Sequence, residues 1–282
     1  MYDNFIMSYN IFREKGIADP LLETLRLFDV MSGGKTGEAL SCSDRNAEDI
    51  AVIAEERKKG VPMEYILGMA TFNGRSFFCT KDTLIPTEET SLLVNTAHDI
   101  IRKRQQAGEV SQTVIEIGAG CGNIGLSLAM LVNDSVRIMA SDISEPAVEV
   151  AKKNAVKFNM DNKVEFFCGD LFGPFTGYEG GTDMVICNPP YIPTTSLKKL
   201  SSEIIDHEPI VALDGGPYGI SFFRRLISEA PRMLKQRGVL IFEIGEGQEK
   251  LINMLFEKNG AYEDIRQFRH GEHVRVICAE KR

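Results

Sequence analysis

The chain has 282 residues, of which 43% are hydrophobic and 26% are charged, and its net charge at pH 7 is -8. This length suggests one large domain or two of ordinary size, with enough apolar residues for a core. The acidic balance argues against unaided, non-specific binding of nucleic acid, which depends on clustered Lys and Arg. No apolar run approaches the roughly 18 residues of a membrane span.

The N-terminus and the cysteines indicate a cytoplasmic protein. The opening MYDNFIMSYN carries an acid and lacks the basic start of a signal peptide. The six cysteines are scattered, without C-x-x-C spacing and without a histidine at metal-ligand spacing. We therefore expect free thiols in a reducing compartment, and no metal site.

Residues 1–67 are predicted to form a small helical domain. Apolar residues recur at helical spacing in three short segments. Asp19-Pro20 marks the start of the second helix, Asp44 is the expected cap of the third, and Gly60 is its expected stop. Two roles are open for this domain. It either supports the rest of the chain or offers a docking surface to a macromolecular partner.

Residues 68–87 are predicted to be a β-hairpin linker, because they combine two glycines with two aromatic clusters. From 88 to 282, helical stretches alternate with short apolar runs. The runs are TVIEI at 113–117, VRIMA at 136–140, VEFFC at 164–168, MVIC at 184–187, VLIFEI at 239–244 and VRVIC at 274–278. This alternation predicts βαβ units, and hence an α/β domain with a mostly parallel, Rossmann-like sheet.

The first of these strands leads into a glycine loop, Glu116-Ile117-Gly118-Ala119-Gly120-Cys121-Gly122. Ligands of doubly wound sheets bind beyond the carboxyl ends of the strands, and glycines let the backbone approach them closely. A dinucleotide fingerprint needs G-x-G-x-x-G, whereas the third glycine here comes one position early. The spacing, with an acid two residues before the first glycine, resembles motif one of class I S-adenosylmethionine-dependent methyltransferases. The alternative is a tight turn that binds no ligand.

Two further strand ends support a nucleotide site. Asp142, followed by Ile143, ends the second strand, where a carboxylate can accept hydrogen bonds from two ribose hydroxyls. The alternative role for Asp142 is the cap of a helix that starts near Glu145. After the third strand, the methyltransferase pattern implies that Asp170 accepts from the adenine amino group. Leu171 and its neighbours would then hold the ring.

The fourth strand ends in the rigid corner Asn188-Pro189-Pro190-Tyr191. Asn-Pro-Pro-Tyr at this place resembles the signature of methyltransferases that act on planar nitrogens. An amide nitrogen is a poor nucleophile, so such an enzyme must hold it in line with the methyl donor. The Asn188 side-chain oxygen and the Pro189 carbonyl can accept its two N–H groups. The prolines fix the backbone, and Tyr191 offers an aromatic wall. The alternative is a proline-rich turn after a strand.

Taken together, these motifs resemble the HemK/PrmC family of release factor glutamine N5-methyltransferases, over nearly the whole chain. The matching segments include Pro62 to Gly68, Asn188 to Ile192, Glu208-Pro209, Ala212 to Gly216, and Phe242 to Gly245 with Gln248. The resemblance implies S-adenosylmethionine as the cofactor, held by Gly118 to Gly122, Asp142, Leu171 and Asn188. It implies N5-methylglutamine in a Gly-Gly-Gln motif as the product. It also implies a release factor gripped by the helical domain as the partner. We expect a monomer that binds no nucleic acid directly.

One segment departs from the family. Where it usually has Ile-Pro-Arg-Pro-Glu-Thr-Glu, this chain has Ile85-Pro86-Thr87-Glu88-Glu89-Thr90-Ser91. In the family this segment lies near the substrate pocket, which makes Glu89 a candidate substrate contact. The change leaves open a relative that methylates a small-molecule or other peptide nitrogen. A DNA or RNA amino-methyltransferase is disfavoured by the acidic balance. A binding module without catalysis is disfavoured by the intact motifs.

Overall fold

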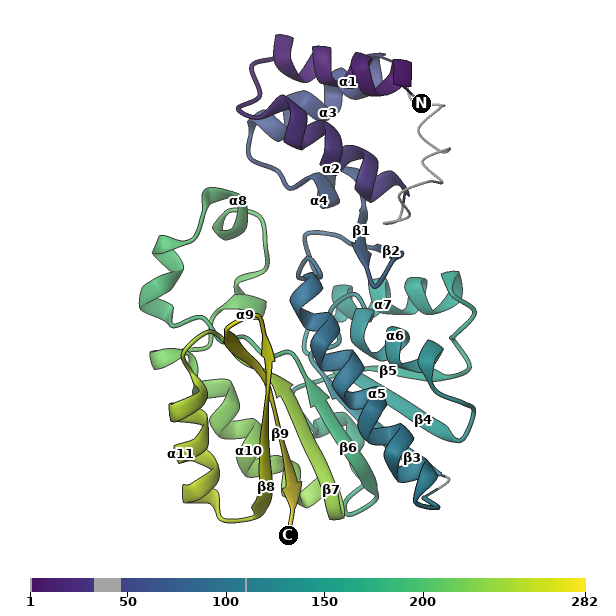
Figure 1. Ribbon diagram of the computed structural model, residues 1–282, viewed down its shortest axis with the longest axis vertical. Coiled ribbons are helices and arrows are strands. Elements are labelled where there is room, and N and C mark those ends of the chain that lie inside the picture. Colours follow the sequence, from purple (N-terminus) through teal and green to yellow (C-terminus); the bar gives the residue numbers. More distant parts are fainter. Residues whose placement is uncertain (1, 33–46, 110) are drawn as a thin grey trace. The chain divides into compact units, whose positions relative to one another are not determined.

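The computed structural model describes residues 2–32, 47–109 and 111–282. The chain divides into two compact units (Figure 1). The first comprises Met1–Pro86 and Leu200–Pro209, and the second comprises Thr87–Lys199 and Ile210–Arg282. The sequence pattern changes after residues 67 and 87, but nothing in it places 200–209 in the first unit. The chain therefore leaves the second unit after Lys199 and returns to it at Ile210.

The first unit is mainly helical. Its described helices are α1 (Tyr2–Glu14), α2 (Pro20–Ser32), α3 (Ala47–Lys58), α4 (Met63–Leu67) and, from the later segment, α8 (Ser202–Ile205). At the start of α2, the Asp19 carboxylate accepts a hydrogen bond from the Leu22 N–H (3.0 Å), with Pro20 in the first position. The expected cap of α3, Asp44, lies outside the described residues.

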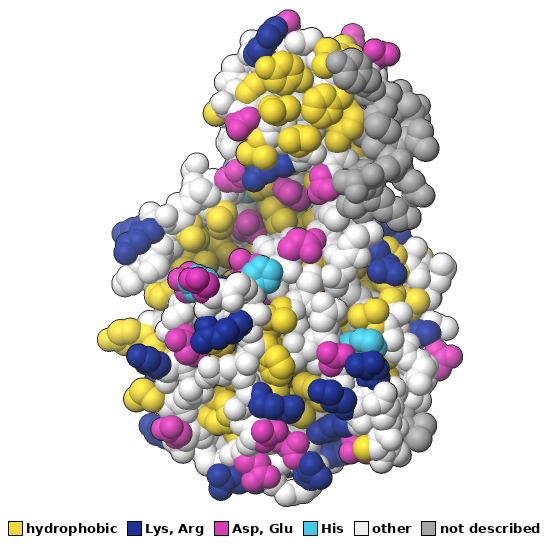
Figure 2. Space-filling model, viewed as in Figure 1, with side chains coloured by type: hydrophobic (Ala, Val, Ile, Leu, Met, Phe, Trp, Pro, Cys, Tyr) yellow, Lys and Arg dark blue, Asp and Glu magenta, His cyan; other side chains and the backbone are white. Residues whose placement is uncertain are grey.

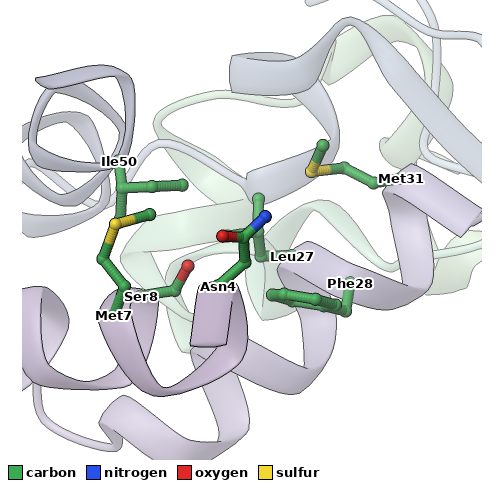
Figure 3. A pocket seen from close by; sticks show the side chains of 7 residues that line it. All are labelled: Asn4, Met7, Ser8, Leu27, Phe28, Met31 and Ile50. Carbon is green, nitrogen blue, oxygen red and sulfur yellow. The ribbon is translucent and has the colours of Figure 1, made fainter. Parts of the chain in front are cut away.

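Helices α1, α2 and α3 of this unit meet in an apolar core. Its buried side chains are Phe12, Leu27, Val30, Ile50, Ile53, Ala54 and Met63. Beside it lies a small pocket whose lining comes from the same three helices (Figure 3): Asn4, Met7, Ser8, Leu27, Phe28, Met31 and Ile50. Hydrophobic side chains also gather on the face of this unit that Figure 2 shows. Among its described residues, the large exposed hydrophobic side chains are Ile6, Leu21, Leu22, Leu25, Val52 and Phe78. Apolar surface of this kind is typical of a protein contact.

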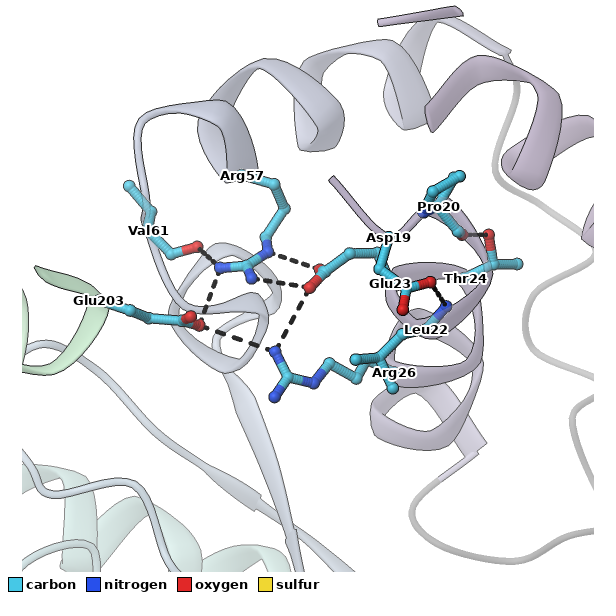
Figure 4. Close-up of polar contacts among 9 residues, drawn as sticks. All are labelled: Asp19, Pro20, Leu22, Glu23, Thr24, Arg26, Arg57, Val61 and Glu203. Carbon is cyan, nitrogen blue, oxygen red and sulfur yellow. Dashed lines mark hydrogen bonds and ion pairs between the residues drawn. The ribbon is translucent and has the colours of Figure 1, made fainter. Parts of the chain in front are cut away.

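An ion-pair cluster ties the segment 200–209 to the helices (Figure 4). The Arg57 guanidinium donates two hydrogen bonds to Glu23, at 2.6 and 2.8 Å, and a third to Glu203 at 2.9 Å. The Arg57 and Glu23 side chains are each only 8% exposed, and Arg26 adds a longer contact to Glu23 (3.3 Å). The bidentate geometry compensates the cost of removing both charges from water.

The predicted hairpin is present as β1 (Met69–Phe72) and β2 (Arg75–Phe78), which pair in antiparallel register. Asn73 and Gly74 form its two-residue turn, and both have positive φ angles (49° and 66°). Asn-Gly is the preferred sequence for this turn, because both central residues must adopt left-handed backbone. Hence the turn chemistry fixes the register of the short hairpin.

The second unit holds a seven-stranded sheet in the order β5-β4-β3-β6-β7-β9-β8. Its strands are β3 (Gln112–Ile117), β4 (Val136–Asp142), β5 (Val164–Cys168), β6 (Thr182–Cys187), β7 (Leu234–Glu243), β8 (Tyr262–His270) and β9 (His273–Lys281). The first five in this order are parallel to one another. β9 runs antiparallel to its two neighbours, β7 and β8, so β8 has the same direction as the first five. The predicted α/β domain with a mostly parallel, Rossmann-like sheet is confirmed.

Helices cover both faces of this sheet. They are α5 (Ser91–Gln106), α6 (Asn123–Leu131), α7 (Glu145–Lys157), α10 (Ser221–Met233) and α11 (Glu249–Asn259). The short helix α9 (Ile210–Leu213) begins where the chain returns to this unit. Helices α10 and α11 lie next to each other (Figure 1). They share one core with alternate strand residues such as Ile115 and Ile117. Glu116 points to the opposite face, where Gly125 of α6 lies against it. Among the described residues, no helix is both long and apolar enough to cross a membrane.

Candidate active site

The motif residues meet at one edge of the sheet because the parallel strands end in register. Ile117 of β3 pairs with Ser141 of β4 and with Cys187 of β6, so the glycine loop, Asp142 and Asn188 follow side by side. The chain order reverses between β3 and β6, with β4 on one side and β7 on the other. Such a switch point is where open α/β sheets bind ligands.

The glycine loop turns tightly above β3. Gly118, Gly120 and Gly122 all have positive φ angles (75°, 54° and 81°), which other residues adopt at a cost. The N–H groups of Gly118 and Ala119 both donate to the carbonyl of Ser141 (2.8 and 2.9 Å). A side chain at Gly122 would come within 3.2 Å of three neighbouring side chains. The loop therefore needs its glycines, and Gly120 leaves open space for a ligand.

Asp142 lies half-buried where β4 ends and holds the loop from the side. Its Oδ2 accepts a hydrogen bond from the Gly120 N–H (2.8 Å), and its Oδ1 accepts from the Ser144 N–H (2.9 Å). The cap of α7 is Ser144, whose hydroxyl accepts from the Ala147 N–H (3.3 Å). The alternative prediction, that Asp142 caps this helix, is therefore wrong. Each carboxylate oxygen keeps a second lone pair for a ligand hydroxyl.

The residues expected around an adenine ring are divided between surface and interior. Asp170 is exposed and forms a bidentate ion pair with Arg225 (2.7 and 3.2 Å). Leu171 is buried, with a positive φ of 46°, and its carbonyl accepts from the Ser141 hydroxyl (3.1 Å). Ile143 is 57% exposed directly after Asp142. It provides apolar surface at the edge of the sheet.

Glu116 lies beneath the loop and is completely buried. Neither carboxyl oxygen has a hydrogen-bond partner among the described residues, although the Gly125 N–H faces the group. Burial raises the pKa of Glu116 to about 8. A neutral carboxyl is therefore favoured here at neutral pH. The glycine at 125 is required, since a Cβ there would lie 2.3 Å from Oε2.

The corner after β6 is held by a residue outside the predicted site. The Asn188 side-chain nitrogen donates to the Thr90 hydroxyl (3.2 Å), and this hydroxyl donates to the Glu243 carboxylate (2.7 Å). Thr90 and Glu243 are each 1% exposed, whereas Asn188 and Tyr191 are half-buried and Pro189 is buried. Asn188 is thus the accessible end of a buried hydrogen-bonded chain.

Arg275 of β9 places a positive charge between Tyr191 and two carboxylates. Its guanidinium contacts Glu243 (3.1 Å), Glu89 (2.6 Å) and the Tyr191 hydroxyl (3.3 Å), and it lies over the tyrosine ring. Burial raises the pKa of Glu243, while the hydrogen bond from Thr90 and the charge of Arg275 oppose this shift. Glu89, predicted to bind substrate, lies half-exposed beside this group.

A second glycine loop supports the corner from behind. A side chain at Gly219 would lie 2.1 Å from the Tyr191 carbonyl, and one at Gly215 would lie 2.9 Å from the Pro190 carbonyl. The Gln248 amide donates to the Tyr191 carbonyl (2.8 Å) and accepts from the Gly245 N–H (2.9 Å). The direction of the corner is therefore fixed by close backbone packing.

This arrangement is suited to hold a flat, uncharged nitrogen next to a nucleoside-like ligand. It offers an amide oxygen, rigid backbone carbonyls and an aromatic side chain at a switch point. Within the described part of the chain, no group of three or more His, Cys, Asp or Glu could hold a metal ion.

Curated relatives resolve which group of proteins carries this site. A release factor glutamine methyltransferase of Bacillus cereus is 34% identical over 82% of this chain and 82% of its own length. Those of Bacillus subtilis and Geobacter sulfurreducens are 36% and 32% identical, over 80% and 88% of this chain and 77% and 84% of their own lengths. This chain belongs to the release factor glutamine methyltransferase family. The resemblance read from its motifs is confirmed.

Broader comparisons agree on the fold of this release factor glutamine methyltransferase family member. The family model "Methyltransferase small domain" matches residues 90–220. The hMettl16 catalytic domain in complex with the MAT2A 3'UTR hairpin 6 has a TM-score of 0.57 and 17% identity, over 83% of this chain and 82% of its own. A ribosomal protein L11 methylase from Lactobacillus delbrueckii subsp. bulgaricus has a TM-score of 0.50 and 17% identity, over 72% and 84%. At this identity, both similarities concern the fold alone.

Three residues of the site were not singled out from the sequence: Thr90, Glu243 and Arg275. An acid inside the apolar run VLIFEI and an arginine inside VRVIC were the available signals, since charged residues are rarely buried without partners. The segment that departs from the family also reaches this place. The Thr87 hydroxyl lies 3.3 Å from that of Thr90.

Proposed function

We propose that this protein transfers a methyl group from S-adenosylmethionine to the side-chain amide nitrogen of a release factor glutamine, in the Gly-Gly-Gln motif. The observation that carries the proposal is the Asn188-Pro189-Pro190-Tyr191 corner at the switch point of the sheet. It occurs in a chain that is 32–36% identical to release factor glutamine methyltransferases over most of its length.

The residues at the edge of the sheet fit the methyl donor. In this proposal the loop Gly118 to Gly122 passes close to its amino acid part, and Asp142 accepts from its ribose hydroxyls. The exposed Ile143 covers the adenine ring, while Leu171 and Asp170 border it. When bound, S-adenosylmethionine supplies a methyl group on a positively charged sulfur atom.

The corner would hold the acceptor. Asn188 Oδ1 and the Pro189 carbonyl accept the two N–H groups of the glutamine amide, and Tyr191 flanks its plane. This places the nitrogen in line for transfer and stabilises the positive charge that develops on it. The nitrogen gains the methyl group and releases one proton. The half-exposed Glu89 borders the entrance to this place.

The helical unit would supply a second contact to the folded partner. It presents exposed apolar side chains on α1, α2 and α3, among them Leu21 (51%) and Leu25 (51%). Replacing both by serine is expected to raise KM for an intact release factor about fivefold or more, but not KM for a short Gly-Gly-Gln peptide. Val156→Ser, at a residue of the second unit that is 64% exposed, is the matched control. Equal KM values for all variants would remove this role.

The reaction itself is tested with purified protein, labelled S-adenosylmethionine and an intact release factor. Mass spectrometry should find one added methyl group on the Gly-Gly-Gln glutamine, and none when that glutamine is replaced by glutamate. Asn188→Ala should lower turnover about 10²–10³-fold and keep most of the donor affinity, because it removes one preorganised contact to the reacting group. An unmodified release factor, with label on a small molecule or another peptide, would favour the alternative acceptor instead.

A further inference from the structure

The orientation of the Asn188 amide is set by two residues behind it. Asn188 Nδ2 lies 3.2 Å from Thr90 Oγ1, and this oxygen lies 2.7 Å from Glu243 Oε2. Thr90 comes from the turn η2 (Glu88–Thr90) before α5, and Glu243 is the last residue of β7. The two contacts therefore join three separate parts of the second unit.

The direction of these hydrogen bonds follows from counting donors. The Arg275 guanidinium, 3.1 Å from Oε1, favours the ionised form of Glu243, which can only accept, so the single proton of the Thr90 hydroxyl is donated to Glu243. The Thr90 oxygen then has only its two lone pairs left, one for Asn188 and one for the Thr87 hydroxyl at 3.3 Å. It can bind the NH₂ end of the amide, but not the oxygen end. The carboxylate thus selects one of the two amide orientations that have the same shape.

The surroundings of Glu243 keep it in a position to do this. Its other oxygen, Oε1, accepts from Arg275 (3.1 Å) and from the Tyr191 hydroxyl (3.4 Å). With Thr90 on Oε2, both oxygens of this buried carboxylate have partners. A rotation of the carboxylate would break contacts on both sides. Thr90 therefore has a fixed acceptor behind it.

We propose that Glu243 and Thr90 are positioning residues that lock Asn188 with its Oδ1 toward the acceptor nitrogen. The inference deepens the proposed function and rests on it. In the opposite orientation, the Asn188 NH₂ would face the NH₂ of the substrate amide, two donors without an acceptor between them. Each unpaired buried donor of this kind is costly, so the flipped form would bind the amide poorly. We call the hydrogen-bonded chain from Glu243 through Thr90 to Asn188 the relay. The relay selects acceptor groups that present N–H groups to the corner.

The first test compares Thr90→Val, which has nearly the same shape without the hydroxyl, with Thr90→Ser, which keeps it. Thr90→Val is expected to lower kcat about 10–100-fold with little change in KM for S-adenosylmethionine, and Thr90→Ser to retain most of the turnover. Thr96→Val is the matched control. Thr96 is buried (6% exposed) on the same segment, and its hydroxyl donates to the Leu92 carbonyl. If Thr90→Val and Thr96→Val turn over alike, the relay is wrong.

A second readout does not need turnover. In ¹⁵N NMR spectra, the side-chain NH₂ of Asn188 should exchange slowly with water in the wild type and in Thr90→Ser, and quickly in Thr90→Val. An NH₂ signal that is the same in all three would overturn the relay, even if Thr90→Val were inactive through misfolding. If the wild type leaves release factor unmethylated, the proposed function fails. The NMR comparison still decides how Asn188 is oriented.

Discussion

Arg57 and Glu203 form an ion pair of 2.9 Å across 146 residues of sequence. Arg57 belongs to α3, whereas Glu203 belongs to the short helix α8 in the segment that follows the corner loop. Because Arg57 also binds Glu23 in bidentate fashion, one guanidinium joins the helical bundle to a segment encoded far downstream. The helical unit is therefore completed by residues from the other half of the chain.

Removing this guanidinium should destabilise the first unit. Arg57→Met is expected to lower the free energy of unfolding by about 3 kcal/mol, because Glu23 would be left buried without its main partner. Lys59→Met, which breaks the exposed Lys59–Glu56 pair, should change it by less than about 0.5 kcal/mol. Denaturant titration measures both. The double variant Glu23→Gln with Arg57→Met should recover part of the loss, and a further loss would contradict this account.

Gly125 on α6 is expected to be irreplaceable by alanine for steric reasons. The added methyl would lie 2.3 Å from Oε2 of the completely buried Glu116 and 3.7 Å from Ile138. Forcing atoms into a packed core typically costs about 1–3 kcal/mol, although alanine is the better helix former. Gly173→Ala is the control, since a Cβ there meets nothing within 4 Å. Thermal melts in which both variants match the wild type would show that Glu116 can move aside.

The buried Glu116 should make stability fall as pH rises. In the unfolded chain its carboxyl ionises above the ordinary value of 4.5, whereas in the folded protein it holds its proton up to about 8. Unfolding therefore releases a proton in this window. Its contribution to stability is complete below 4.5 and is lost as pH rises toward 8, at up to about 1.4 kcal/mol per pH unit.

Glu116→Gln cannot ionise and should remove this part of the pH dependence. Denaturant titrations at several pH values between the two pKa values would show the variant gaining stability over the wild type as pH rises. The exposed Glu257→Gln serves as the control and should follow the wild-type profile. Parallel curves for Glu116→Gln and the wild type would mean that Glu116 is ionised in the folded protein.

Asp142→Ala should weaken S-adenosylmethionine binding about 10- to 100-fold, since each charge-assisted hydrogen bond contributes about 1.5–3 kcal/mol. Ser144→Ala separates this role from helix capping. It removes the cap of α7, at a cost of about 1 kcal/mol in stability, and should leave the affinity unchanged. Isothermal titration calorimetry measures both affinities. Equal behaviour of the two variants would reduce Asp142 to a structural residue.

The sequence predicts most of the second unit because buried parallel strands are continuous apolar runs. Six such runs correspond to strands β3 to β7 and β9. The strand β8 has no such signal, since it lies at the edge of the sheet and only Tyr262 in it is buried. The residues of the corner were also identified from the sequence, because two adjacent prolines after a strand are a strong local signal.

Local sequence patterns do not predict contacts between residues that are far apart in the chain. Thr90 and Glu243 are 153 residues apart, and their hydrogen bond exists only once α5 and β7 are in place. A threonine before a helix predicts a cap, and nothing local distinguishes it from one that binds a buried carboxylate. The segment 200–209 likewise contacts the first unit through the Arg57–Glu203 pair and the hydrogen bond from the Ile85 N–H to Glu208. No local pattern in the sequence indicates either contact.

The placement of residues 200–209 in the first unit also constrains the order in which the two units fold during synthesis. Arg57 leaves the ribosome long before Glu203, so the first unit cannot reach its final set of contacts while only its N-terminal residues are available. By then strands β3 to β6 have already been translated. The two units therefore mature in nested order, unlike the usual one-after-another folding of consecutive domains. A fragment that ends at Pro86 is for the same reason an incomplete version of the helical unit.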